Sequence, residues 1–189
     1  DTVNEKALEA AMRIYNGKPM VNSVSGKQES MDAVFPLIQK YGGVVVALTL
    51  DENGIPETAE GRVEIAKNIL SVAKDYGIEK NNIIFDTLAM TISADQSAAS
   101  ETLKALNIIK NELGCHTSLG VSNVSFGLPN RDVINSVFFS LALENGLSGA
   151  IMNPYSAEMM KTYLIYLAVA SALTFVFLSV KVFMLLKRQ

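Results

Sequence analysis

Residues 44–50 read VVVALTL, an apolar run that is followed directly by Asp51. A run of this length, rich in valine and leucine, is typical of a strand buried on both faces of a parallel sheet. Similar runs occur along the chain at residues 19–23, 82–86, 117–121 and 149–152. The sequence therefore predicts five short, buried strands.

Segments with apolar residues at helical spacing lie before and between these runs. They predict helices at residues 5–15, 30–41, 58–76, 98–113 and 130–145. Four of these helices are followed by a glycine, which is the residue that a helix C-terminus favours: Gly42, Gly77, Gly114 and Gly146. Strands that alternate with such helices form βαβ units, which predicts an α/β fold.

A polar residue recurs near the end of each predicted strand. These residues are Asn22, Asp51, Asp86, Asn123 and Asn153. The carboxyl ends of the strands form the active face of an α/β barrel, so we expect the five side chains to share a pocket. The alternative is that such residues form turns, which Asp and Asn favour.

The length of the chain predicts an incomplete barrel. A complete (β/α)8 barrel takes about 250 residues, whereas residues 1–162 supply five βα units and a stub. Asp1 precedes the first predicted helix in the way that a strand-end residue would, so we expect the first two or three strands to be missing. The chain begins at Asp1 with no signal segment, and we expect it to be cut from a longer, cytoplasmic protein.

Composition excludes several kinds of site. Cys115 and His116 are the single cysteine and the single histidine, so the chain can form neither an internal disulfide nor a Cys/His zinc site, and we expect no metal. Residues 1–161 carry 13 basic and 19 acidic residues, a net charge of −6. An acidic body of this kind argues against nucleic-acid binding.

Residues 163–189 differ from the rest of the chain. Residues 163–186 contain a single charge, Lys181, and would form a helix about 36 Å long, enough to cross a bilayer. Three interpretations stay open: a transmembrane helix that tethers the chain to a membrane, an apolar helix packed on the domain, or a stretch joined by frameshift or fusion. We predict one long helix with a wide exposed apolar surface.

Four motifs carry a resemblance to a known family. They are NSVS at residues 22–25, Phe85-Asp86, GVSNVSFGLP at residues 120–129 and AIMNP at residues 150–154. In order and spacing they resemble the pterin-binding domain of cobalamin-dependent methionine synthase. That family also includes methyltetrahydrofolate:corrinoid methyltransferases and shares its barrel with dihydropteroate synthase.

The resemblance implies a dihydropteroate-synthase-like TIM barrel over residues 1–162 that binds methyltetrahydrofolate. It implies transfer of the N5 methyl group to cob(I)alamin on a corrinoid-binding domain or protein, as part of methionine synthesis. It also implies site residues, to which we add Asn153 at the last strand end. The predicted pterin site consists of Asp1, Asn22, Asp86, Asn123, Arg131 and Asn153.

The chemistry of a pterin suits these residue types. A carboxylate such as Asp86 accepts two N–H bonds at once from the pyrimidine edge of the ring, although an aspartate here could instead cap the next helix. Asn22 and Asn123 each offer a donor and an acceptor. The N5 amine must carry positive charge to leave the methyl group, and an amide oxygen can accept a bond from N5–H⁺. Asn123 is therefore the predicted catalytic residue.

Other residues receive structural interpretations. We expect His116 to precede its strand, at the wrong end of the barrel for the site, and Cys115 to be a small buried hydrophobe. The second hypothesis for the whole chain is a non-catalytic or membrane-tethered fragment of a pterin-binding protein. Dihydropteroate synthase fits less well, because its lysine in the seventh-strand loop and its late Arg-x-His are absent from this sequence.

Overall fold

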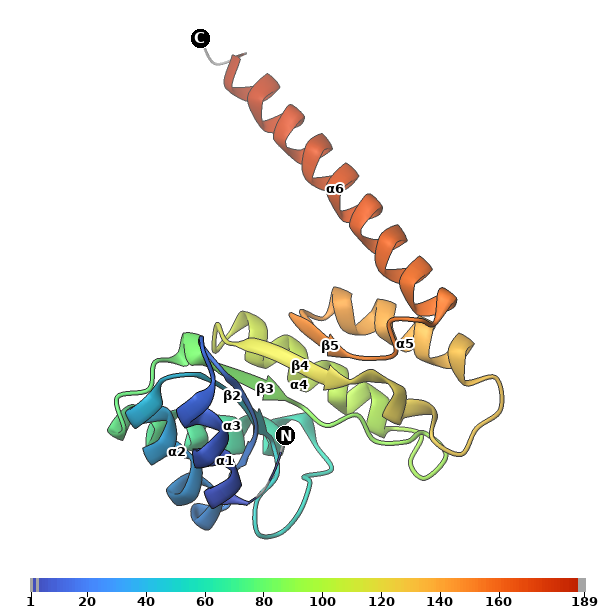
Figure 1. The fold of residues 1–189 in the computed structure, drawn as a ribbon. Helices are drawn as coiled ribbons and strands as arrows, with labels where there is room; N and C mark the ends of the chain where they lie inside the picture. The colour runs from blue at the N-terminus through green and yellow to red at the C-terminus, as the bar shows by residue number, and fades with distance from the viewer. Residues whose placement is uncertain (1, 3, 187–189) are drawn as a thin grey trace.

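The computed structural model describes the backbone of residues 2 and 4–186 and the side chains as far as Ala172. It contains one parallel sheet with its strands in chain order, and the helices alternate with them (Figure 1). The strands are β1 (Met20–Ser25), β2 (Val44–Leu48), β3 (Ile83–Asp86), β4 (His116–Gly120) and β5 (Gly149–Ile151). The α-helices are α1 (Glu5–Ile14), α2 (Gln28–Tyr41), α3 (Ala59–Asp75), α4 (Ala98–Asn111), α5 (Arg131–Glu144) and α6 (Ala157–Leu186). Two short 3₁₀ helices are η1 (Lys80–Asn82) and η2 (Val121–Ser125).

All five predicted strands and all five predicted helices of the body are present. Most boundaries differ from the predicted ones by one or two residues, which is the usual uncertainty of helix and strand ends. The feature that was not predicted is in β1, which continues to Ser25 through an irregularity between Asn22 and Val24. Each predicted capping glycine has a left-handed φ, between 66° and 97°. A residue with a Cβ atom would be strained there.

The sheet is an open part of a barrel. Neighbouring helices contact one another in chain order from α1 to α6, as they do in the outer layer of a (β/α) barrel. β1 and β5 are the two outer strands and do not pair with each other. The inner face of the sheet borders a cavity of about 620 Å³, and the residues that line it include Asn22, Val46, Ile84 and His116. The incomplete (β/α) barrel predicted from the sequence is therefore confirmed.

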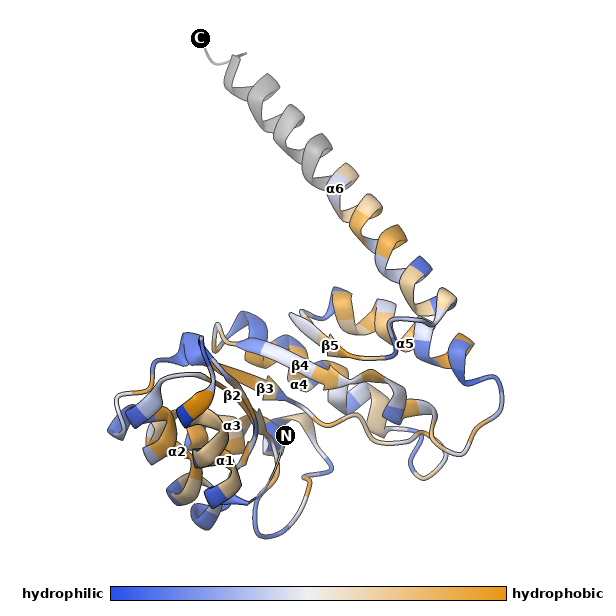
Figure 2. Cartoon of the chain, viewed as in Figure 1, coloured by the Kyte–Doolittle hydropathy of each residue, from blue (hydrophilic) through white to orange (hydrophobic). Residues whose placement is uncertain are grey.

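Two apolar clusters hold the helices against the sheet. The first joins β1, β2 and β3 to α1, α2 and α3, with Phe35, Ile69 and Phe85 among its buried members. The second joins β4 and η2 to α4, α5 and the start of α6. Cys115 is 2% exposed and belongs to the first cluster, so its prediction as a small buried hydrophobe is confirmed. In Figure 2, β3 has a hydrophobic colour over most of its length, whereas β4, with the sequence HTSLG, is mostly blue to white.

The tail forms a single helix that leaves the body (Figure 1). Its start is anchored by Met159, which is buried, and by Tyr166, whose hydroxyl donates to the carbonyl oxygen of Leu143 at 3.2 Å. Leu164 and Ile165 are mostly exposed, so the predicted exposed apolar surface is confirmed as far as Ala172. The remaining side chains of the predicted 163–189 segment lie outside the described residues. Within the part of the chain that the structure describes, no helix is both long and apolar enough to span a membrane.

Candidate functional site

Asp86 is the last residue of β3 and is 8% exposed. Burial raises the pKa of its carboxyl from the usual 3.8 to about 6, and hydrogen bonding from the backbone N–H groups of Leu88 and Gly120 opposes this rise. The Leu88 N–H donates to Oδ1 at 2.8 Å. The Asp86 side chain thus lies at the C-terminal end of the strands. Backbone N–H groups of its own loop and of β4 hold it there. The alternative in which Asp86 caps α4 is wrong, because α4 begins at Ala98.

Asn123 lies in η2, directly after β4, and is exposed. Its side-chain nitrogen is 3.0 Å from the position that a Cβ atom on Gly120 would occupy. Gly120 therefore contacts the Asn123 amide and also hydrogen bonds to the Asp86 carboxyl. These two residues, predicted from separate motifs, are brought to one place by the last residue of β4.

Arg131 lies at the start of α5 and holds the loop that carries Asn123. Its Nε donates to Ser125 Oγ at 3.0 Å and its Nη2 donates to the carbonyl oxygen of Ser122 at 2.8 Å. The guanidinium also lies over the exposed ring of Phe126, 5.8 Å from its centroid. Arg131 therefore lies beside η2, and its hydrogen bonds are to the loop that carries Asn123.

The loops after β3 and β4 are tied together. The Thr91 hydroxyl donates to the carbonyl oxygen of Phe126 at 2.8 Å, and the Ser93 hydroxyl does so at 3.1 Å. The Ile92 N–H donates to the carbonyl oxygen of Val124 at 3.0 Å. The loop that follows Asp86 therefore supports the loop that contains Asn123.

Asn22 lies in the middle of β1 and not at its end, which corrects the prediction. It is in register with Val46, which pairs with Ile84, which in turn pairs with His116. Asp86 is two residues further along, in register with Ser118. Asn22 therefore lines the inner face of the sheet two residues nearer the amino ends of the strands than Asp86.

His116 is the first residue of β4, so the prediction that it precedes the strand is wrong. It shares the inner-face cavity with Asn22, although it lies toward the amino end of the strand, as expected. Ser118, on the same cavity and level with Asp86, was missed. The sequence could have indicated Ser118, because it stands two residues before Gly120 in the strand that leads to Asn123.

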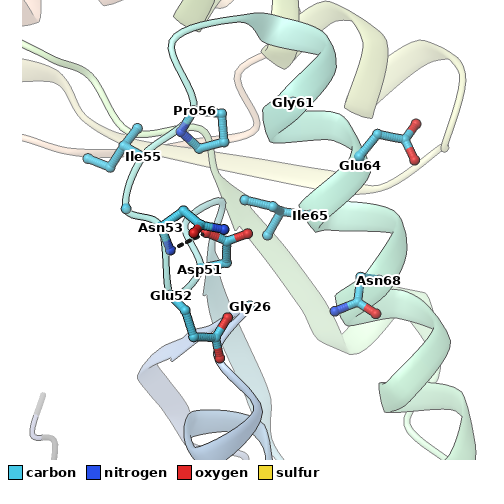
Figure 3. Close-up of a pocket in the computed structure, with 11 residues that line it drawn as sticks. Gly26, Asp51, Glu52, Asn53, Ile55, Pro56, Gly61, Glu64, Ile65 and Asn68 are labelled. Atoms are coloured by element: carbon cyan, nitrogen blue, oxygen red, sulfur yellow. Dashed lines mark hydrogen bonds between the residues drawn. The ribbon is translucent and has the colours of Figure 1, made fainter.

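Two of the predicted strand-end residues form turns. Asn153 Oδ1 accepts the N–H of Tyr155 at 3.0 Å, and Asp51 Oδ1 accepts the N–H of Asn53 at 2.8 Å. Asp51 also lines a separate cavity of about 510 Å³ between its loop and α3, shown with Glu64 and Asn68 in Figure 3. Polar residues at strand ends thus have both roles considered above, since Asp86 and Asn123 converge whereas Asn153 and Asp51 shape their own loops.

The remaining predictions concern Asp1 and metal binding. Asp1 lies outside the described residues. Across the described residues, no group of three or more His, Cys, Asp or Glu side chains could hold a metal ion. The arrangement that remains is a buried carboxyl and a neighbouring amide at the carboxyl ends of β3 and β4. Together they can accept N–H bonds from a flat heterocycle and accept or donate at a second edge of it.

Comparison with known proteins identifies the family. The sequence model of the pterin binding enzymes matches residues 1–153. The chain belongs to this family. Within it, the chain is 32% identical over 163 residues to the methylcorrinoid:tetrahydrofolate methyltransferase of Eubacterium limosum, and this match covers 85% of the chain and 60% of that protein. It is 34% identical over 166 residues to the methionine synthase of Mycobacterium tuberculosis, a match that covers 81% of the chain and 14% of that protein.

Several solved structures with the same fold are dihydropteroate synthases. The enzyme from Clostridium difficile, crystallised with pteroic acid, aligns with a TM-score of 0.71 at 22% identity and covers 89% of this chain and 65% of its own. The enzyme from Xanthomonas albilineans aligns with a TM-score of 0.65 at 18% identity, over 90% of this chain and 67% of its own. These similarities establish the barrel fold for a chain that spans about two thirds of those enzymes.

Proposed function

We propose that this chain binds the pterin ring of methyltetrahydrofolate between Asp86 and Asn123 and serves methyl transfer between N5 and a corrinoid cobalt. The observation that carries the proposal is that the buried Asp86 carboxyl and the Asn123 amide both contact Gly120, in a pterin binding enzyme similar to two methyltransferases. Asn22, Arg131 and Asp1 are secondary members of the proposed site, whereas Asn153 shapes its own loop.

Asp86 is the proposed anchor for the ring. Its carboxylate accepts the ring N–H and the exocyclic N–H of the pterin as a pair of charge-assisted bonds, which fix the ring in one orientation. The ligand replaces water as the partner of a partly desolvated group. Binding therefore favours the ionised form of Asp86 and lowers its pKa from about 6.

Asn123 is the proposed catalytic residue. Its amide oxygen accepts a hydrogen bond from the protonated N5 and favours the positive charge that makes N5 a leaving group. The methyl group leaves N5 without its bonding electrons, and N5 keeps the pair as a neutral secondary amine with its proton. The cobalt of cob(I)alamin, carried by a corrinoid-binding partner, supplies the electron pair for the new bond. Transfer in the opposite direction passes the same transition state, so the same interaction serves both.

A calorimetric titration of methyltetrahydrofolate into the chain at pH 7.5 tests the proposal. Asp86→Ala should weaken binding about 100-fold or more, since it removes two charge-assisted bonds. Asp75→Ala, an exposed aspartate at the end of α3, is the matched control and should bind normally. Equal affinities for the wild type and Asp86→Ala would remove Asp86 from the site.

Formation of methylcobalamin from free cob(I)alamin, read by absorbance, tests the reaction. Binding of the folate without any methyl transfer would favour the alternative interpretation, a non-catalytic fragment of a pterin-binding protein.

A further inference from the structure

Arg62, on α3, is an arginine in the core of the protein. Its side chain is among the largest fully buried ones, and its residue is 1% exposed. Burial lowers the pKa of the guanidinium, while the charges of Glu101 and Asp95 oppose that shift. Within the described residues it forms no ion pair closer than 4 Å. A buried charge is costly unless its donors are all satisfied, so the partners of Arg62 show what it stabilises.

Those partners are mainly backbone oxygens of two loops. Nε donates to the carbonyl oxygen of Pro56 at 2.9 Å. Nη1 donates to the carbonyl oxygens of Thr87 at 2.8 Å and Leu88 at 3.2 Å, and to Thr102 Oγ1 at 2.8 Å. One side chain thus joins the loop after β2, the two residues that follow Asp86 and helix α4.

The segment it holds has an uncommon conformation. Leu88 has a φ of 61°, in the left-handed region that a leucine rarely adopts. This conformation directs the Leu88 N–H to Asp86 Oδ1 at 2.8 Å. Thr102 Oγ1 also lies 3.2 Å from the Leu88 carbonyl oxygen. Such a conformation persists only where neighbouring groups hold it. Here Arg62 and Thr102 hold it through the carbonyl oxygen of Leu88.

We propose that Arg62 is a positioning residue for Asp86, which it orients by fixing the carbonyl groups of Thr87 and Leu88. Two nitrogens of its planar fork bond to two different loops, Nε to Pro56 and Nη1 to Thr87 and Leu88, and a lysine ammonium with one nitrogen cannot span both loops. The part of this proposal that concerns folate binding rests on the proposed function. The orientation of Asp86 by Leu88 does not, and it is measured without a ligand.

The ligand-free test follows the amide resonance of Leu88 by NMR between pH 4.5 and 8. In the wild-type chain this amide should titrate with the Asp86 carboxyl, and Asp86→Asn should abolish the titration and so assign it. Arg62→Lys, which keeps the charge, should reduce the amplitude at Leu88 by half or more. Arg13→Lys is the matched control, because Arg13 is largely exposed on α1. An unchanged amplitude and midpoint in Arg62→Lys would overturn the proposal.

A second variant guards against loss of the fold. Thr102→Val removes the hydroxyl at nearly constant volume and should reduce the Leu88 amplitude in the same direction by a smaller amount. A normal Leu88 titration in a folded Thr102→Val chain, together with unfolding of Arg62→Lys, would assign Arg62 to stability alone and overturn the proposal.

Folate affinity then connects the position of Asp86 to binding. Arg62→Lys should weaken methyltetrahydrofolate binding at least 10-fold in the wild-type background and less than 2-fold when Asp86 is already asparagine. Equal losses in both backgrounds would contradict action through Asp86. Absence of folate binding by the wild-type chain would refute the proposed function, while the Leu88 titration would still decide the role of Arg62.

Discussion

The side-chain nitrogen of Asn123 lies against Gly120, 3.0 Å from the position where a Cβ atom would stand. Gly120 has φ −75° and ψ 81°, which other residues can also adopt, so the absence of a side chain matters here for space. The same glycine contributes its backbone N–H to the Asp86 carboxyl. Gly120 thus contacts both groups of the proposed site.

Gly120→Ala should displace the Asn123 amide by a few tenths of an ångström and leave the fold intact. We expect the rate of methyl transfer to fall about 10-fold or more, because small displacements of a catalytic group are costly. The free energy of unfolding should change by less than about 1 kcal/mol. Gly149→Ala is the control, since a Cβ atom there meets no other atom within 4 Å. Equal rates for the two variants would show that Gly120 does not restrict Asn123.

Asp86→Asn should change how stability depends on pH. The pKa of Asp86 is raised from 3.8 to about 6 in the folded chain. Between these values the unfolded chain loses the proton first, so stability falls as pH rises from about 4 and the loss is complete above about 6. The whole effect is about 3 kcal/mol, at about 1.4 kcal/mol per pKa unit.

Urea unfolding at pH 4.5 and pH 7.5 measures this effect. The wild type should lose more stability between the two pH values than Asp86→Asn does, because asparagine keeps the acceptor for Leu88 and carries no charge. The titration of all other groups cancels in the comparison. Parallel stability profiles for the two proteins would mean that the Asp86 carboxyl is not raised in pKa.

Asn123→Ala should act on the rate more than on binding. Its hydrogen bond becomes stronger as N5 gains charge, so its loss should lower the maximal rate about 100-fold and weaken methyltetrahydrofolate binding only a few-fold. Single-turnover kinetics with cob(I)alamin separate the two quantities. Asn111→Ala, at the exposed end of α4, serves as control. A loss confined to affinity, with a normal maximal rate, would contradict the catalytic role.

Cys115 should be unreactive in the folded chain. Burial raises the pKa of its thiol, and Sγ lies 3.7 Å from the carbonyl oxygen of Leu113, to which it donates. Because the thiolate is the reactive form, an aromatic disulfide reagent at pH 7.5 should modify the folded chain about 100-fold more slowly than the urea-unfolded chain. The single cysteine makes the count of modified thiols unambiguous. Fast reaction of the folded chain would show that the core around Cys115 opens readily.

For Arg62, the sequence pattern predicts the burial of the side chain but not its hydrogen-bond partners. Arg62 stands four, seven and eleven residues before Ala66, Ile69 and Ala73, so it lies on the apolar stripe of its helix. This periodicity alone predicts that its side chain faces the core. Which carbonyl groups it meets there could not be predicted, because they belong to loops 6 to 26 residues away in the chain.

The sequence by itself determined the alternation of strands and helices, the glycine helix ends and the burial of Cys115. These features depend on local periodicity and on backbone preferences of single residues, which act within a few positions of the chain. The family motifs also located Asp86 and Asn123, because those motifs keep their order and spacing along the chain.

Only the tertiary structure decided which polar strand-end residues converge. Strand register places Asn22 level with His116 and two residues nearer the amino ends of the strands than Asp86. Asn153 forms a turn with its own neighbours, whereas Asn123 folds back over Gly120. Register and loop conformation arise from contacts between residues distant in sequence, and a shift of one residue would turn a side chain to the other face of the sheet. No local pattern carries that information.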